Sequence, residues 1–188
     1  MVRNISYYMM ECKSDEQMLL RDIYSIGMQT WFSGRRFIEK VTTPVVVEIV
    51  DGYETGELIE YFSSRCLMRK DLIDCIRSAG VDNIDVYDSI IRDTDKNIDY
   101  DDYMAVNIIG LVSCTDPEET EYYSENPSRL VDADIESLKI DESKTSDLLM
   151  FRLAECVSGV VVHEKIKTAV DKAGFENMIF YDPKDWVG

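Results

Sequence analysis

The residues of this chain best suited to binding chemistry are carboxylates interleaved with tyrosines, and they gather in one stretch. The candidate partner-binding residues are Asp116, Glu118, Glu119, Glu121, Tyr122 and Tyr123. Carboxylates steer a basic partner toward the surface, and tyrosines offer large, rigid contact areas. An ordinary solvated loop can have the same composition, so the sequence leaves both interpretations open.

A second acidic stretch is similar to the start of a calcium-binding loop. It carries oxygen-bearing side chains at alternate positions, namely Asp93, Asp95, Asn97 and Asp99. However, Ile98 stands where an EF-hand requires glycine, and Met104 stands where it requires a bidentate glutamate. Because the flanking residues also favour strands, we expect a solvated hairpin turn here and no metal site.

The single histidine, His163, is the only candidate for a general base of the imidazole type. A nucleophile pair would need a cysteine beside it, of which Cys156 is the nearest in sequence, and a third group to orient the ring. No residue pattern supplies that third group, and the chain has no nucleophile elbow, Walker loop or dinucleotide-binding glycine motif. We therefore expect His163 to lie at the start of a helix. We also expect the protein to have no catalytic residues and no cofactor.

Two segments of the chain, one of which contains His163, are related to each other. Residues 67–88 and 161–182 align without a gap, and five pairs coincide: Ala79/Ala173, Gly80/Gly174, Asn83/Asn177, Tyr87/Tyr181 and Asp88/Asp182. Apolar residues recur every three to four positions in each segment, which predicts an amphipathic helix. Gly80 and Gly174 then stand where a residue with positive φ would end the helix, so both are structural candidates. Each segment is thus predicted to form a helix, a glycine-terminated turn and a strand.

The rest of the chain favours strands. Alternating or β-branched runs predict strands at residues 5–11, 44–50, 103–114, 133–140, 148–153 and 159–162, with Gly110 a possible bulge. The stretch 18–40 is ambiguous between helix and loop, and residues 116–129 are expected to form a loop. No linker divides the chain, so we predict an α+β fold with a mixed or antiparallel sheet in a single domain spanning residues 1–188.

Composition restricts the class of partner. The chain has 188 residues, 45% of them hydrophobic, and a formal net charge of −17, which opposes binding to nucleic acid or to an anionic membrane. Its five cysteines are scattered and form no CxxC motif, so we expect free, mostly buried thiols. Without an evident signal peptide or a long apolar run, the sequence predicts a cytoplasmic protein with a basic partner.

Several motifs of the chain, in their order and spacing, resemble a bacterial immunity-protein family. These motifs are Trp31–Gly34, Tyr103–Asp116, Ile140–Glu142, Leu149–Leu153, Val161–Ile166 and Ala173–Phe175. The family, formerly a domain of unknown function, belongs to polymorphic-toxin and contact-dependent competition systems. The resemblance covers about residues 31–183. The departures from it lie in the first sixty residues, where the methionine-rich stretch has no clear counterpart.

The resemblance implies protection against a cognate protein toxin by direct, stoichiometric binding, without catalytic residues. It does not imply which toxin is bound or the oligomeric state. The alternative is a non-enzymatic interaction or small-ligand-binding module unrelated to toxins.

Overall fold

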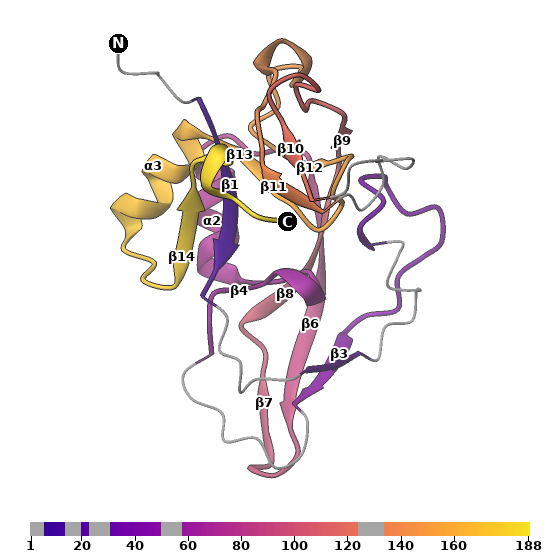
Figure 1. Ribbon diagram of the computed structural model, residues 1–188. Helices are drawn as coiled ribbons and strands as arrows, with labels where there is room; N and C mark the ends of the chain where they lie inside the picture. The colour runs from indigo at the N-terminus through magenta and orange to yellow at the C-terminus, as the bar shows by residue number, and fades with distance from the viewer. Residues whose placement is uncertain (1–5, 14–19, 23–30, 50–57, 124–133) are drawn as a thin grey trace.

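The computed structural model describes residues 6–13, 20–22, 31–49, 58–123 and 134–188 (Figure 1). Residues 18–19 and 23–30 of the ambiguous stretch 18–40, and residues 124–129 of the predicted loop, lie outside these residues. Within them the fold is α+β in a single domain, as the sequence predicts. No described helix is long and apolar enough to cross a membrane.

Each of the two related segments contains a helix and a following strand, as predicted, and a short strand comes before each helix. The first unit consists of β5 (Leu67–Arg69), α2 (Lys70–Ser78) and β6 (Ile84–Asp93). The second consists of β13 (Val160–His163), α3 (Glu164–Ala173) and β14 (Met178–Tyr181). The helices form because one stripe of each is apolar, and this stripe is buried at Leu72, Ile73 and Ile76 in α2 and at Ile166 and Val170 in α3.

Both predicted glycine turns are confirmed, although the two caps differ. Gly80 has φ of 110° and Gly174 has φ of 78°, in the region that side chains resist. After α2, the Val81 N–H donates to the Ile76 carbonyl over 3.1 Å and the Gly80 N–H to the Arg77 carbonyl over 2.9 Å, which is a Schellman motif. After α3, the Gly174 N–H donates to two carbonyls of the last turn, at 3.2 Å each, in the simpler left-handed cap.

The two units also share a strand arrangement that the sequence did not reveal. In the first unit, β8 (Tyr103–Ile108) lies between β5 and β6 and is antiparallel to both. In the second, β1 (Tyr7–Cys12) lies between β13 and β14 and is antiparallel to both. Each unit is therefore a split β-α-β unit, whose two parallel strands are separated by one antiparallel strand.

The strands form two large sheets and one small sheet. The five-stranded sheet has the order β14-β1-β13-β12-β9, and the seven-stranded sheet has the order β2-β3-β6-β8-β5-β4 with β7 paired to β6. The remaining elements are β2 (Leu20–Asp22), β3 (Val45–Ile49), β4 (Tyr61–Phe62), η1 (Ser63–Arg65), β7 (Ile98–Tyr100), β9 (Leu111–Val112), β10 (Glu121–Tyr122), β11 (Ile135–Ser137), η2 (Glu142–Lys144), β12 (Met150–Leu153) and η3 (Pro183–Asp185). The small sheet pairs β10 with β11.

The predicted long strand 103–114 is wrong in one respect. It divides into β8 and β9, and these belong to different large sheets. Gly110, with φ of 131°, lies at the division, so it is a crossing point rather than a bulge. The Asn83 side chain holds this point, because its amide donates to the Ile109 carbonyl on one side and to the Met150 carbonyl on the other.

The predicted strand 133–140 is also shorter than expected. Within the described part of this segment, the strand covers only Ile135–Ser137, because its partner β10 has two residues. Ile140 forms an isolated bridge with Thr115 instead.

One hydrophobic core joins both large sheets to both helices. It contains buried residues of α2 and α3 together with Met10, Val106, Met150 and Val162 from the sheets. Figure 1 shows α2 and α3 beside each other on one side of the five-stranded sheet, and the two helices are in contact. The opposite face of this sheet packs in a second core with β11 and Trp186.

The cysteines are free thiols, and three of the five, Cys66, Cys114 and Cys156, are buried. Burial raises the pKa of the Cys114 thiol from 9.0 to about 12 and that of the Cys12 thiol from 9.0 to about 11. In the unfolded chain both thiols ionise first, so the stability they contribute is complete below pH 9 and is lost as the pH rises toward 12.

We therefore expect the urea midpoint to be constant from pH 7.5 to 8.5 and to fall markedly by pH 10.5. Denaturation followed by tryptophan fluorescence at these pH values measures this. Cys114→Ala should show a smaller fall above pH 9, because one of the two thiols is removed. A wild-type midpoint that is the same at pH 8 and pH 10.5 would contradict the expectation.

Candidate functional site

The acidic stretch Asp116–Tyr123 is held firmly by its neighbours. The Asp116 N–H donates to the Lys139 carbonyl over 2.8 Å, and the Thr120 hydroxyl accepts from the Lys139 N–H over 3.2 Å. At the far end, β10 pairs with β11, and the Tyr123 N–H donates to the Asp134 carbonyl over 3.1 Å. Backbone bonds at both ends therefore fix the direction in which the side chains between them project.

The structure divides the six predicted partner-binding residues into two groups. Asp116 and Tyr122 are half-buried and serve the fold: the Asp116 carboxylate accepts from the Glu118 N–H over 3.0 Å, and the Tyr122 ring packs on the second core. The side chains of Glu118, Glu119, Glu121 and Tyr123 are exposed, Tyr123 to 59%. Glu119 also pairs with Lys139 at 3.6 Å.

Two further carboxylates belong to this surface, and the sequence analysis did not select them. Asp134 and Glu136 are exposed, and Glu136 lies on β11 next to the buried Ile135. Since side chains alternate along a strand, Glu136 and Glu121 both point away from the core. The sequence analysis expected apolar and polar residues to alternate along 133–140. That pattern places Glu136 on the exposed face of the strand and could have identified it. We define the acidic surface as Glu118, Glu119, Glu121, Tyr123, Asp134 and Glu136.

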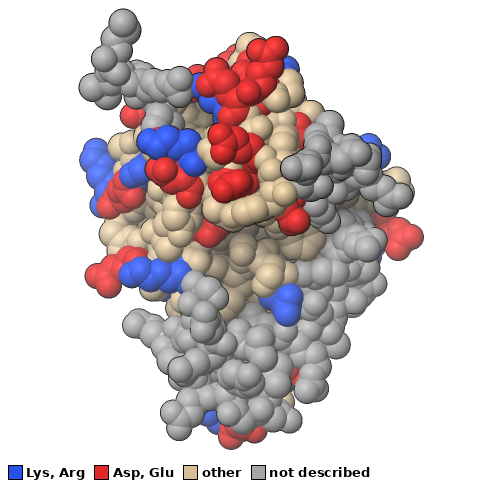
Figure 2. Space-filling view, viewed as in Figure 1, with Lys and Arg blue, Asp and Glu red and all other residues tan. Residues whose placement is uncertain are grey.

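The exposed side chains of this surface are predominantly anionic. Figure 2 shows acidic side chains gathered at the top of the view, over the strands that Figure 1 labels β10 to β13. Among the described contacts, Lys139 is the cation that lies against the acidic surface, where it pairs with Glu119. The remaining carboxylates contribute to a field that the net charge of −17 reinforces.

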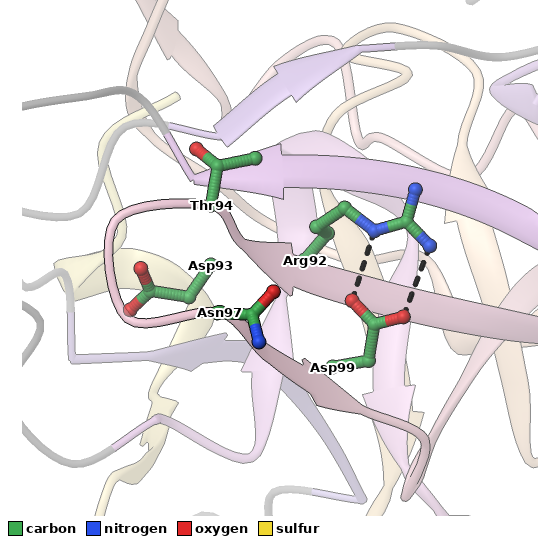
Figure 3. A pocket seen from close by; sticks show the side chains of 5 residues that line it. All are labelled: Arg92, Asp93, Thr94, Asn97 and Asp99. Carbon is green, nitrogen blue, oxygen red and sulfur yellow. Dashed lines mark hydrogen bonds and ion pairs between the residues drawn. The ribbon is translucent and has the colours of Figure 1, made fainter.

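The calcium-like stretch forms the predicted hairpin turn between β6 and β7. Figure 3 shows the open depression beside this turn, of about 480 Å³, lined by Arg92, Asp93, Thr94, Asn97 and Asp99. Arg92 and Asp99 form a two-point ion pair, with both N···O distances 2.9 Å. Asp93 is buried and accepts from the Lys96 N–H over 3.0 Å. These carboxylates thus hold the hairpin together, and strands rather than EF-hand helices flank it.

His163 lies at the start of a helix, as predicted. It is the N-cap residue of α3, and its Nδ1 accepts from the Lys165 N–H over 3.1 Å. Arg69 occupies the equivalent N-cap position of α2. Cys156 is buried, and its Sγ lies 3.2 Å from the Ser158 hydroxyl. The described contacts of both residues are therefore those of structural side chains.

A buried arginine lies between the two large sheets and was not selected from the sequence. Arg152 on β12 is 0% exposed. Its Nη1 donates to the Val157 carbonyl over 2.9 Å, its Nη2 contacts the Cys66 sulfur at 3.3 Å, and the guanidinium lies 4.5 Å from the centre of the Phe32 ring. The signal available in the sequence was a cation inside the apolar run Leu149–Leu153.

No protein-family model matches this chain, and no curated protein is significantly similar to it. The resemblance to the immunity-protein family therefore stays a prediction. The groups of side chains described above are the basis for assigning a function.

Proposed function

We propose that this protein is an immunity protein that neutralises a bacterial toxin by direct, stoichiometric binding through the acidic surface. The observation that carries the proposal is that this surface is held rigidly. Its exposed carboxylates project from a segment fixed by the β10–β11 pairing and by the bonds to Lys139. A rigid binding surface loses little conformational freedom on association, so more of the contact energy appears as affinity.

The charge of the surface supports a basic toxin, such as a nuclease. Carboxylates fixed in space attract the phosphate-binding cations of such an enzyme and occupy the place of its nucleic acid. Tyr123 adds an aromatic ring, 59% exposed, among these carboxylates, in the manner of a contact anchor. A protein that acts in this way needs a stable scaffold and a complementary surface and requires no nucleophile of its own.

The experiment that tests the proposal pairs this protein with the toxin domain encoded beside its gene. Co-expression should rescue growth, and the purified proteins should form a one-to-one complex in which toxin activity is blocked. Protection should rise linearly with the molar ratio and reach completion near equivalence, because an occluding inhibitor is consumed one for one. Full protection at a small fraction of the toxin concentration would point instead to an enzyme that reverses the damage.

A pair of matched variants tests the surface itself. Replacing Glu118, Glu121 and Glu136 by glutamine should slow association about tenfold at low salt, since these carboxylates provide the local attraction. The control replaces the exposed Asp74, Asp101 and Asp102 by asparagine, which changes the net charge equally at another place. Equal slowing by both triple variants would assign the effect to net charge and not to the acidic surface.

A further inference from the structure

A second exposed segment has the opposite character to the acidic surface. Residues 34–40, which we call the cationic loop, contain three cations, Arg35, Arg36 and Lys40, against the one carboxylate of Glu39. All four side chains are exposed. Between them the Ile38 side chain is 103% exposed, whereas the other exposed large apolar residues among those described range from 42% to 59%. A fully exposed isoleucine side chain among cations contributes hydrophobic free energy only when a partner covers it.

The cationic loop is fixed by an aromatic cluster, in which its own Phe37 stacks on Tyr87 and meets Trp31 edge-on. The Phe37 ring lies 4.8 Å from the Trp31 ring and 5.7 Å from the Tyr87 ring, measured between centroids. Trp31 is fully buried, and Tyr87 lies on β6 of the large sheet. Because Phe37 is anchored in this way, the neighbouring Ile38 is directed outward, and the loop has little freedom to fold it back.

Hydrogen bonds place the same loop against the junction of β8 and β9. The Gly110 N–H donates to the Gly34 carbonyl over 2.8 Å, and the Asn107 side chain donates to the Arg35 carbonyl over 2.8 Å. Gly34 also lies against Leu111, the first residue of β9, whose side chain is 42% exposed. The chain leads from β9 through Thr115 into the acidic surface, so one short segment connects the loop contact to that surface (Figure 1).

We infer that the cationic loop is a second half of the toxin interface, with Ile38 as the anchor that enters an apolar pocket bordered by carboxylates. This inference rests on the proposed function. Charge complementarity selects the partner surface: Arg35, Arg36 and Lys40 match carboxylates, as the acidic surface matches cations. A nuclease offers both, because carboxylates commonly hold its catalytic metal ions inside a basic groove for nucleic acid.

The two halves of the interface act on different rates. Long-range attraction between the acidic surface and a basic toxin accelerates encounter, so its loss lowers the association rate. An apolar anchor makes its contacts only after docking, so its loss raises the dissociation rate. Kinetics can therefore separate the anchor from the steering charges.

The experiment measures association and dissociation of the toxin domain encoded beside the gene, using wild type and three variants at two ionic strengths. Ile38→Ser should raise the dissociation rate about 30- to 100-fold and change the association rate less than about twofold. Glu118, Glu121 and Glu136 replaced together by glutamine should show the reverse pattern. The matched control is Ile98→Ser, which removes another exposed isoleucine, 42% exposed, on β7 at the far end of the molecule in Figure 1.

Each outcome has one meaning. If wild type binds the toxin and Ile38→Ser binds with unchanged kinetics, the inference is wrong and the proposed function stands. If wild type forms no complex, the proposed function itself fails. Sedimentation of the protein alone completes the test: self-association that Ile38→Ser abolishes, with toxin binding unaffected, would assign the loop to a second copy of this chain. Since Ile38 contributes a fully exposed side chain, the thermal midpoint of Ile38→Ser should equal that of wild type.

Discussion

Replacing Gly34 with alanine should lower the free energy of unfolding by about 2–4 kcal/mol, because two penalties coincide at this position. The backbone has φ of 65°, which a residue with a Cβ adopts only at a cost. An added Cβ would also lie 2.7 Å from the Leu111 Cβ and 2.9 Å from the Gly110 carbonyl carbon. These are atoms of the main chain or next to it, so they cannot move aside as the end of a flexible side chain can.

Gly174→Ala is the matched control for this prediction. Gly174 has φ of 78°, but an added Cβ would meet no atom within 4 Å, so only the conformational cost of about 1 kcal/mol remains. Urea denaturation of both variants, compared at equal slope, measures the difference. Equal losses of stability would show that the contact with Leu111 relaxes freely, and would weaken the view that the cationic loop is fixed against β9.

Arg152→Ala should be the other large loss, of about 3–5 kcal/mol, because it empties a site between the two sheets. The Val157 carbonyl would lose its donor, and Phe32 would lose the guanidinium that covers its ring. Arg152→Met distinguishes the contribution of packing from that of the charge, because methionine refills most of the space but forms no hydrogen bonds. We expect Arg152→Met to cost only about 1–2 kcal/mol, because the described contacts of Arg152 include no carboxylate and its Nε has no hydrogen-bond partner among the described residues.

Chemical denaturation of the two variants tests the ranking. A methionine variant as unstable as the alanine variant would mean that the charge stabilises the fold. Arg152→Lys is an informative third variant: a single ammonium group cannot reproduce the fork that reaches both Val157 and Cys66, so lysine should be less stable than methionine. The order of alanine, lysine and methionine therefore distinguishes packing from charge.

The sequence by itself determined the local features of this protein. The apolar stripes of residues 67–88 and 161–182 predicted both helices, because helical periodicity needs only neighbours three and four residues away. Gly80 and Gly174 predicted the positions of the helix ends for the same reason, since a cap involves one turn and the next two residues. The hairpin at residues 93–98 and the position of His163 at the start of a helix were equally local, and both were predicted correctly.

Only the tertiary structure decided which residues of the acidic stretch are available to a partner. Asp116 and Tyr122 differ little in type from Glu121 and Tyr123. Distant residues, Lys139 and the second core among them, cover the first pair in part and leave the second pair exposed. The split β-α-β arrangement was likewise hidden, because the inserted strands β1 and β8 lie outside residues 67–88 and 161–182. Burial and strand pairing depend on contacts between residues far apart in sequence, and periodicity carries no record of those contacts. For that reason the exposure of Ile38, the burial of Arg152 and the packing of the cationic loop against Gly110 and Leu111 became visible only in the folded chain.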